Sequence, residues 1–172
     1  MMSVRINGLA SMHGIFKYTK LKETRRFLDA LPCINAGGCG ISAYAMYLWL
    51  KKENQLPEDF KFVFLHFPSS EEDFLSNKSA LDNGNGKLYA PEHVAIKYKG
   101  EIIDSKGVVD TDIFSLFFEV SLEKAEQYIV NSINADDWNS SFNRPMFVPI
   151  IEKELGISFR ADLRREKKSW EV

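Results

Sequence analysis

The sequence predicts an α+β domain in which a buried central helix packs on an antiparallel sheet. Three observations lead to this class. Residues 41–53 carry helix formers and apolar side chains on nearly every face, which is typical of a helix at the centre of a fold. Two stretches rich in aromatic and β-branched residues, 60–67 and 93–104, follow and are expected to be strands. Helical patterns stand before and after these strands, so helices and strands are largely segregated along the chain.

The first part of the chain predicts a helix that leads into a glycine-rich loop. Residues 19–31 carry a partial apolar stripe, with Thr19 placed to cap the helix and Pro32 placed to end it. The following segment, 33–40, reads CINAGGCG, and its three glycines allow tight turns and close approach to the backbone. The central apolar helix is expected to begin directly after this loop.

A polar connection over 68–91 is long for a compact domain. Such a segment is typical of a substrate-binding or lid element, and disorder is the competing interpretation. The remaining expected elements are a hairpin over 93–104 with its turn at Lys99–Gly100, helices over 121–134 and 148–155, the second ended by Gly156, and a charged surface tail.

Length and composition argue against several function classes. The 172 residues fit one domain, 1–172, and 45% of them are apolar, which is enough for a packed core. The formal net charge of −2 gives no support for a nucleic-acid partner. No apolar run has the length that secretion or membrane insertion needs, so we expect a cytoplasmic protein without membrane contact. The oligomeric state stays open.

The two cysteines, Cys33 and Cys39, are expected to be reduced thiols. A disulfide between them would close only a short loop, and the chain shows no other secretory feature. Neither belongs to a Cys-x-x-Cys pair, and the three histidines are widely scattered. We therefore expect no metal site and no cofactor.

Cys39 stands at the boundary between the glycine-rich loop and the central helix. A thiolate at a helix N-terminus faces unpaired backbone N–H groups and the positive end of the dipole, which lowers its pKa. The same N–H groups are suited to an oxyanion formed beside the sulfur. Gly37, Gly38 and Gly40 would let a substrate carbonyl approach the backbone closely. A cysteine in apolar surroundings, taken alone, is more often an inert core residue.

The hairpin over 93–104 supplies a histidine and an aspartate. If Lys99–Gly100 is a two-residue turn, Tyr98 opposes Glu101, and His93 and Asp104 become diagonal neighbours on one face of the sheet. A carboxylate so placed accepts from one imidazole nitrogen and leaves the other to take a thiol proton. The opposite face carries an apolar set suited to the core, consisting of Val94, Ile96, Tyr98 and Ile103.

Each of these residues also has a structural interpretation. A histidine that begins a strand is more often simply hydrogen-bonded, and Asp104 could only start a turn. The combination favours chemistry, because a thiol at a helix start, a histidine and an aspartate follow one another in that chain order. Cys39, His93 and Asp104 are therefore predicted to form a catalytic triad. His66 is a weaker second base, since no acidic residue stands at a comparable spacing.

These motifs resemble the transglutaminase-like branch of the papain-like cysteine hydrolases. The first part of the resemblance is a Gly-Cys that opens a helix, a small residue, and a turn before a strand, here Gly38-Cys39, Ala43, Leu56-Pro57 and Phe60 to Leu65. The second part is a histidine that opens a strand, a turn with glycine and an aspartate that ends the next strand, here His93, Gly100 and Asp104. The resemblance covers roughly residues 35–107.

The resemblance implies a papain-like α+β fold with a central buried helix on an antiparallel sheet. It also implies that Cys39 is the nucleophile, His93 the general base and then acid, and Asp104 the residue that orients His93. The oxyanion hole of the family often includes a polar side chain shortly before the nucleophile. Asn35 is the nearest candidate, together with the backbone around Gly38.

The expected function is that of a cysteine peptidase or amidase that cleaves a peptide, isopeptide or side-chain amide through a thioester. One alternative is a transglutaminase or acyltransferase, in which an amine resolves the thioester; another is an inactive binding or inhibitory module on the same fold. A half-match to the papain Cys-Gly-Ser-Cys-Trp motif would place Ser42 at the nucleophile position, but Cys39 is the thiol at the helix boundary. The Arg-Gly-Gly-x-Cys motif of the similar arylamine acetyltransferases is not matched.

Overall fold

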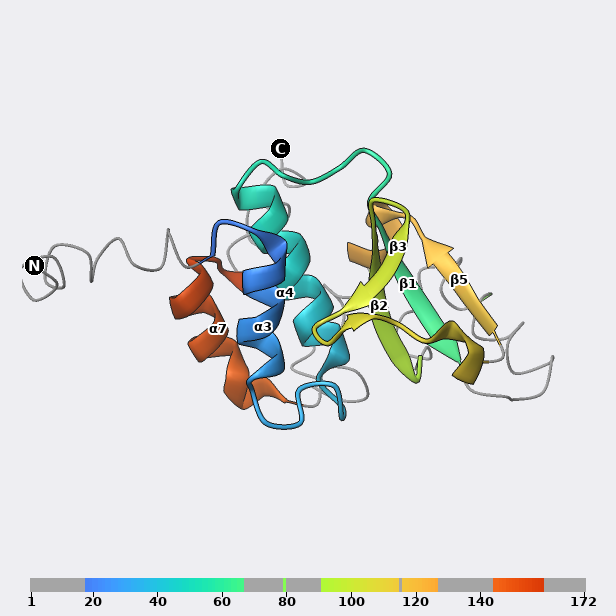
Figure 1. The fold of residues 1–172 in the computed structure, drawn as a ribbon, viewed down its shortest axis with the longest axis horizontal. Coiled ribbons are helices and arrows are strands. Elements are labelled where there is room, and N and C mark those ends of the chain that lie inside the picture. The colour runs from blue at the N-terminus through green and yellow to red at the C-terminus, as the bar shows by residue number, and fades with distance from the viewer. Residues whose placement is uncertain (1–17, 67–78, 80–90, 115, 127–143, 160–172) are drawn as a thin grey trace, which may run out of the picture.

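In the computed structural model, which describes residues 18–66, 79, 91–114, 116–126 and 144–159, one buried helix lies at the centre of the fold (Figure 1). This helix, α4, spans Cys39–Lys52, and every residue from Cys39 to Leu50 is buried. The prediction of a central helix with no polar face is therefore confirmed. The helix begins two residues earlier than expected, so that Cys39 is its first residue.

Two further helices cover the side of α4 that faces away from the sheet (Figure 1). The first, α3, spans Leu21–Asp29 and buries Leu21, Thr24 and Leu28 on one stripe. Its N-cap is Lys20 rather than the predicted Thr19, and Thr19 instead donates from its backbone N–H to Glu23 Oε2 at 2.9 Å. The helix begins one residue later than predicted, and the Glu23 carboxylate accepts from the backbone N–H groups of Thr19 and Lys20 before its first turn.

The second covering helix is α7, which spans Val148–Leu155 as predicted and follows a short 3₁₀ turn, Pro145–Phe147. It ends at Gly156, whose φ of 65° lies in the left-handed region. Lys52 Nζ, from the last turn of α4, donates to the Leu155 carbonyl and so ties the two helices together. Of the helix predicted over 121–134, residues 122–126 are helical and the rest lies outside the described residues.

The strands form one antiparallel sheet with the order β4-β3-β2-β1-β5. The predicted strand and hairpin are confirmed as β1, β2 and β3, whereas β4 and β5 were not predicted. The bounds are Lys61–His66 for β1, His93–Tyr98 for β2, Glu101–Asp104 for β3, Gly107–Val108 for β4 and Leu116–Val120 for β5. Apart from residues 79 and 91, the predicted connection over 68–91 lies outside the described residues, as does the charged tail from 160 onward.

The β2–β3 hairpin has the predicted register. Tyr98 opposes Glu101 across the two-residue turn at Lys99 and Gly100. Both turn residues have positive φ, 51° and 82°, as a type I′ turn requires. This register fixes which residues of the hairpin share a face.

Both faces of the sheet are buried near its centre. The face towards α4 carries the predicted apolar set Val94, Ile96 and Ile103 together with Phe62 and Phe64, and Tyr98 packs at its margin. The opposite face carries a smaller cluster, Val63, Leu65 and Ala95, with Ile102, Val109 and Phe114 packed against it. The second cluster explains why β1 is apolar at successive positions instead of alternating. Among the described helices, none is long and apolar enough to cross a membrane.

Candidate active site

The predicted nucleophile opens the central helix. Cys39 is the first residue of α4 and is only 2% exposed. No side chain caps this helix end, and the first bond within the helix runs from Ser42 N–H to the Gly38 carbonyl at 3.0 Å. The first-turn amides of a helix have no acceptor within the helix, so this end presents N–H donors and positive partial charge beside the thiol.

Gly38, the N-cap of α4, lies where no other residue fits. A Cβ on this residue would stand 2.5 Å from the Ile34 carbonyl oxygen and 3.0 Å from Arg144 Cγ. The side on which a Cβ would lie is therefore filled by the chain itself. The glycine permits a close backbone approach, as expected, but the group that approaches is the Ile34 carbonyl. A role of Gly38 towards a substrate stays a prediction.

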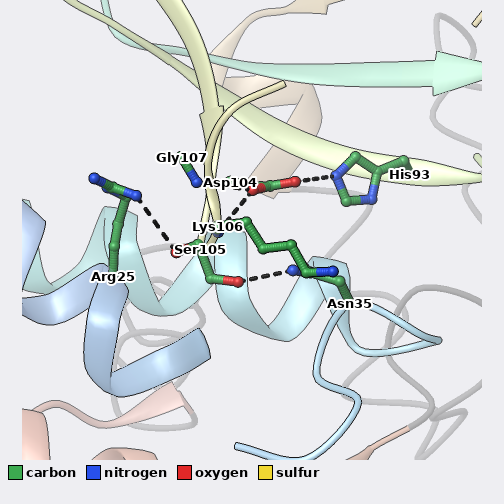
Figure 2. Close-up of polar contacts among 7 residues, drawn as sticks. All are labelled: Arg25, Asn35, His93, Asp104, Ser105, Lys106 and Gly107. Atoms are coloured by element: carbon green, nitrogen blue, oxygen red, sulfur yellow. Dashed lines mark hydrogen bonds and ion pairs between the residues drawn. The ribbon is translucent and has the colours of Figure 1, made fainter. Parts of the chain in front are cut away.

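His93 and Asp104 meet across the hairpin (Figure 2). His93 is the first residue of β2, and Asp104 is the last residue of β3. The His93 Nε2–H donates to Asp104 Oδ2 at 3.0 Å, and the two side chains are 12% and 14% exposed. The diagonal relation that the register predicted is thus observed as a direct hydrogen bond.

The same imidazole also contacts the thiol. A side-chain hydrogen bond joins His93 to Cys39, and because Nε2 faces Asp104, Nδ1 is the nitrogen left for the sulfur. Burial by itself lowers the pKa of His93. The hydrogen bonds to Asp104 and Cys39 and the attraction to both groups outweigh it and raise the pKa from 6.5 to about 9. The ring therefore carries a proton at neutral pH.

Asp104 does start a turn, as its structural interpretation suggested, and it binds His93 as well. Its Oδ1 accepts from the backbone N–H groups of Lys106 and Gly107 at 2.8 and 3.3 Å, while Oδ2 accepts from His93 (Figure 2). Burial raises the pKa of Asp104, but the bond from His93 and the two amide donors hold it below its usual value. The two interpretations of this residue are compatible, because each oxygen serves one of them.

One aromatic neighbour of the imidazole was not predicted. The Phe114 ring stacks on His93, with centroids 5.9 Å apart and planes inclined by 11°. Phe114 follows the 3₁₀ turn Thr111–Ile113 and precedes β5. No local signal in the sequence identifies it, because only the sheet topology brings this segment back to the start of β2.

Asn35, the expected oxyanion side chain, is placed against the turn that follows Asp104. Its Nδ2 donates to Ser105 Oγ at 2.8 Å (Figure 2). Its Oδ1 is buried and has no hydrogen-bond partner among the described residues. Contact with an oxyanion stays a prediction.

Two other candidates can now be placed. Ser42, the alternative nucleophile position, has a buried Oγ that finds no hydrogen-bond partner within the described part of the chain. His66 has an acidic partner after all, since its Nδ1 lies 2.7 Å from Glu92 Oε2. The expectation that it lacks one was wrong. Because Leu65 pairs with His93, the antiparallel register brings His66 opposite Glu92. This register joins strands across a long connection, so local spacing does not predict the pair.

Possible metal ligands and the two cysteines can also be placed within the described residues. In the described ranges, no group of three or more His, Cys, Asp or Glu side chains is arranged to hold a metal ion. Cys33 and Cys39 are both free thiols, the first exposed and the second buried.

The chain matches no family model, no curated protein and no solved structure.

Proposed function

We propose that this protein is a cysteine hydrolase of the transglutaminase-like and papain-like type, which cleaves a peptide, isopeptide or side-chain amide through a thioester. One observation carries the proposal: the His93 imidazole bonds the partly buried Asp104 carboxylate through Nε2 and also contacts the thiol at the start of α4. The chain order Cys39, His93, Asp104 supports the family resemblance, as does the buried helix packed on an antiparallel sheet.

In the proposed acylation step, the thiol has passed its proton to His93, and the thiolate attacks the amide carbonyl carbon. A C–S bond forms, and the carbonyl oxygen becomes an oxyanion that first-turn amides of α4 stabilise. His93 then donates its proton to the departing nitrogen as the C–N bond breaks. The amine leaves, and the acyl group remains on Cys39 as a thioester. The raised pKa of His93, about 9, supports its role as the proton donor.

In the proposed deacylation step, His93 accepts a proton from a water molecule, and the resulting hydroxide attacks the thioester carbonyl. The C–S bond breaks, the acid departs, and the thiolate–imidazolium pair is restored. Asp104 keeps the ring oriented in both steps, because its Oδ2 accepts from Nε2 while turn amides hold its Oδ1. If a primary amine attacks instead of water, the same site performs acyl transfer. An activated thiol also suits a reducing compartment such as the cytoplasm.

Selective alkylation tests the activated thiol with a control inside the same chain. Cys33 is exposed and Cys39 is 2% exposed, so access alone would make Cys33 the faster site for iodoacetamide. Activation predicts the reverse order at neutral pH, measured by peptide mass spectrometry over time. Cys33→Ala should leave the fast phase intact, whereas Cys39→Ala should abolish it and His93→Gln should slow it. The proposal fails if Cys39 labels no faster than Cys33.

A second experiment separates the outcomes of the thioester. The protein is incubated with a library of amide substrates, with and without a biotinylated primary amine, and the products are read by mass. Release of the free acid supports hydrolysis, and transfer to the amine supports the transglutaminase alternative. A Cys39→Ala chain that keeps the whole biological effect would instead support the binding or inhibitory module.

A further inference from the structure

The turn after Asp104 is joined to the loop before Cys39 by a partly buried hydrogen bond. Asn35 Nδ2 donates to Ser105 Oγ at 2.8 Å, and Ser105 is 2% exposed. Figure 2 shows Asn35 reaching from its loop to Ser105, with Asp104 beyond it turned towards His93. The segment that carries the thiol and the segment that carries the carboxylate are thus connected by atoms that take no part in the proposed reaction.

A second element holds the same residue through its main chain. Arg25, on α3, donates from Nη1 to the Ser105 carbonyl at 3.4 Å. The guanidinium also lies close to Gly107, where an added Cβ would stand 3.5 Å from Nη1. Ser105 is therefore held by the loop through its hydroxyl and by α3 through its carbonyl. Because Ser105 directly follows Asp104, its fixed position restricts where the carboxylate can lie.

The turn amides that bind Asp104 Oδ1 do not fix the carboxylate relative to Cys39. Its Oδ1 is held by the amides of Lys106 and Gly107, which belong to the same turn. These bonds orient the carboxylate within the turn, and they move with it. The bonds of Ser105, by contrast, connect the turn to the loop of Asn35 and to α3. A shift of the turn would carry Asp104 and the bound imidazole away from the thiol.

We propose that Asn35, acting through Ser105, is a positioning residue that keeps the Asp104–His93 pair in place against Cys39. This inference rests on the proposed function and assigns Asn35 a role different from the oxyanion contact expected from the resemblance. An oxyanion donor acts on the substrate, whereas this residue acts on the turn. The two roles predict different responses to substitution of Ser105.

A double-mutant cycle measured by alkylation separates the two roles. Iodoacetamide forms a C–S bond and expels iodide without passing through an oxyanion, so a residue that only stabilises an oxyanion does not affect its rate. Asn35→Ala, Ser105→Ala and the double variant are compared for the rate at Cys39, corrected for the folded fraction by far-ultraviolet circular dichroism. We expect each single variant to slow labelling by about tenfold to about a hundredfold, as small misplacements of reacting groups do. The double variant should be no slower than the slower single variant.

Two further measurements exclude a general loss of stability. The pH profile of labelling should change in both single variants in the same direction, and Ser105→Thr, which keeps the hydroxyl, should restore both the rate and the profile. Unchanged labelling in Asn35→Ala, an effect of Asn35→Ala without one of Ser105→Ala, or effects that multiply in the double variant would each overturn the inference.

The NMR titration of His93 keeps this test distinct from that of the proposed function. The pKa of His93 is raised to about 9, in part by the bond to Asp104, so loss of the link should lower it in both single variants. If wild-type Cys39 labels no faster than Cys33, the proposed function fails, and a lower His93 pKa in both variants still supports the positioning role. An unchanged titration in both variants overturns that role, whatever the thiol does.

Discussion

Replacement of Gly38 by alanine is a small change at the point where the loop enters the central helix. Gly38 has φ of −115° and ψ of 13°, a conformation that alanine can adopt. The obstacle is steric, because the new Cβ would lie 2.5 Å from the Ile34 carbonyl oxygen. That oxygen belongs to the backbone, so relief of the clash requires the loop or the first turn of α4 to move.

The cost follows from two opposing contributions. Overpacking of a tight site typically costs about 1–3 kcal/mol. Replacement of glycine also restricts the unfolded chain, which offsets at most about 1 kcal/mol. We therefore expect Gly38→Ala to lower the free energy of unfolding by about 1–2 kcal/mol. Since the shift displaces Cys39 from His93, labelling of Cys39 should slow by about tenfold or more.

Gly100→Ala provides the matched control. Nothing lies within 4 Å of an added Cβ there, but the φ of 82° is strained for alanine and costs about 1–2 kcal/mol. The two variants thus carry the same chemical change and similar losses of stability. Gly100 lies at the turn of the hairpin, whereas His93 and Asp104 lie at its other end.

Urea unfolding followed by circular dichroism gives the stability of each variant, and timed alkylation under native conditions gives the reactivity of Cys39. Gly38→Ala should lower both quantities, and Gly100→Ala should lower stability alone. The steric reasoning is refuted if Gly38→Ala is as stable as the wild type and labels at the same rate. Equal slowing in both variants would show that reactivity follows stability rather than the geometry at Gly38.

Four further predictions concern the two histidines and their neighbours. Because His93 keeps its proton until about pH 9, amide cleavage should decline above that pH. Asp104→Asn should move this decline to lower pH in a pH–rate profile. An alkaline limb that does not move would contradict the contribution of the His93–Asp104 bond to the pKa of His93. The pKa of His93 is raised from 6.5 to about 9, so the stability gained from its protonated form should be complete below pH 6.5 and lost as the pH rises to about 9. Cys39→Ala removes two of the causes that raise this pKa and should therefore narrow that interval in urea unfolding; an unchanged interval would contradict the assigned contact. Phe114→Ala removes the stacked ring, so it should lower stability by about 0.5–1.5 kcal/mol beyond the lost burial and should slow the labelling of Cys39. Phe114→Tyr should retain the wild-type stability and labelling rate. Labelling at the wild-type rate in Phe114→Ala would show that the ring does not orient His93. His66→Ala removes a buried ring from the pair with Glu92 and should lower stability by about 2–3 kcal/mol. The labelling rate of the folded protein should change little, because the pair that is lost is with Glu92; a lost fast phase in fully folded protein would contradict this.

The parts of the fold that local chemistry determines could be predicted from the sequence. The hairpin depends on Lys99–Gly100, whose backbone adopts the conformation of a type I′ turn, and its register then follows by counting. The buried helix depends on its lack of a polar face. Its first residue was missed because Gly38 and Gly40 mark a loop by their local pattern, whereas the helix already begins at Cys39.

The parts that depend on distant segments could not be predicted in the same way. Strand β5 exists because it pairs with β1, and its sequence, LFFEV, lacks a regular alternation of apolar and polar residues. The hydrogen bond between His93 and Asp104 followed from one hairpin and was found. The contacts of Phe114 with His93 and of Arg25 with Ser105 come from elements that only tertiary packing brings near, so no spacing rule identifies them.

The helix that carries Cys39 and the hairpin that carries His93 are separate pieces of the chain, and they meet only when α4 packs against β2. In an unfolded or newly synthesised chain, Cys39 is therefore an ordinary thiol with no base beside it. The reactivity that we propose for it depends on the completed fold and would disappear with it. On this proposal, misfolded copies carry no enhanced nucleophile, and the labelling rate of this one residue would report correct assembly.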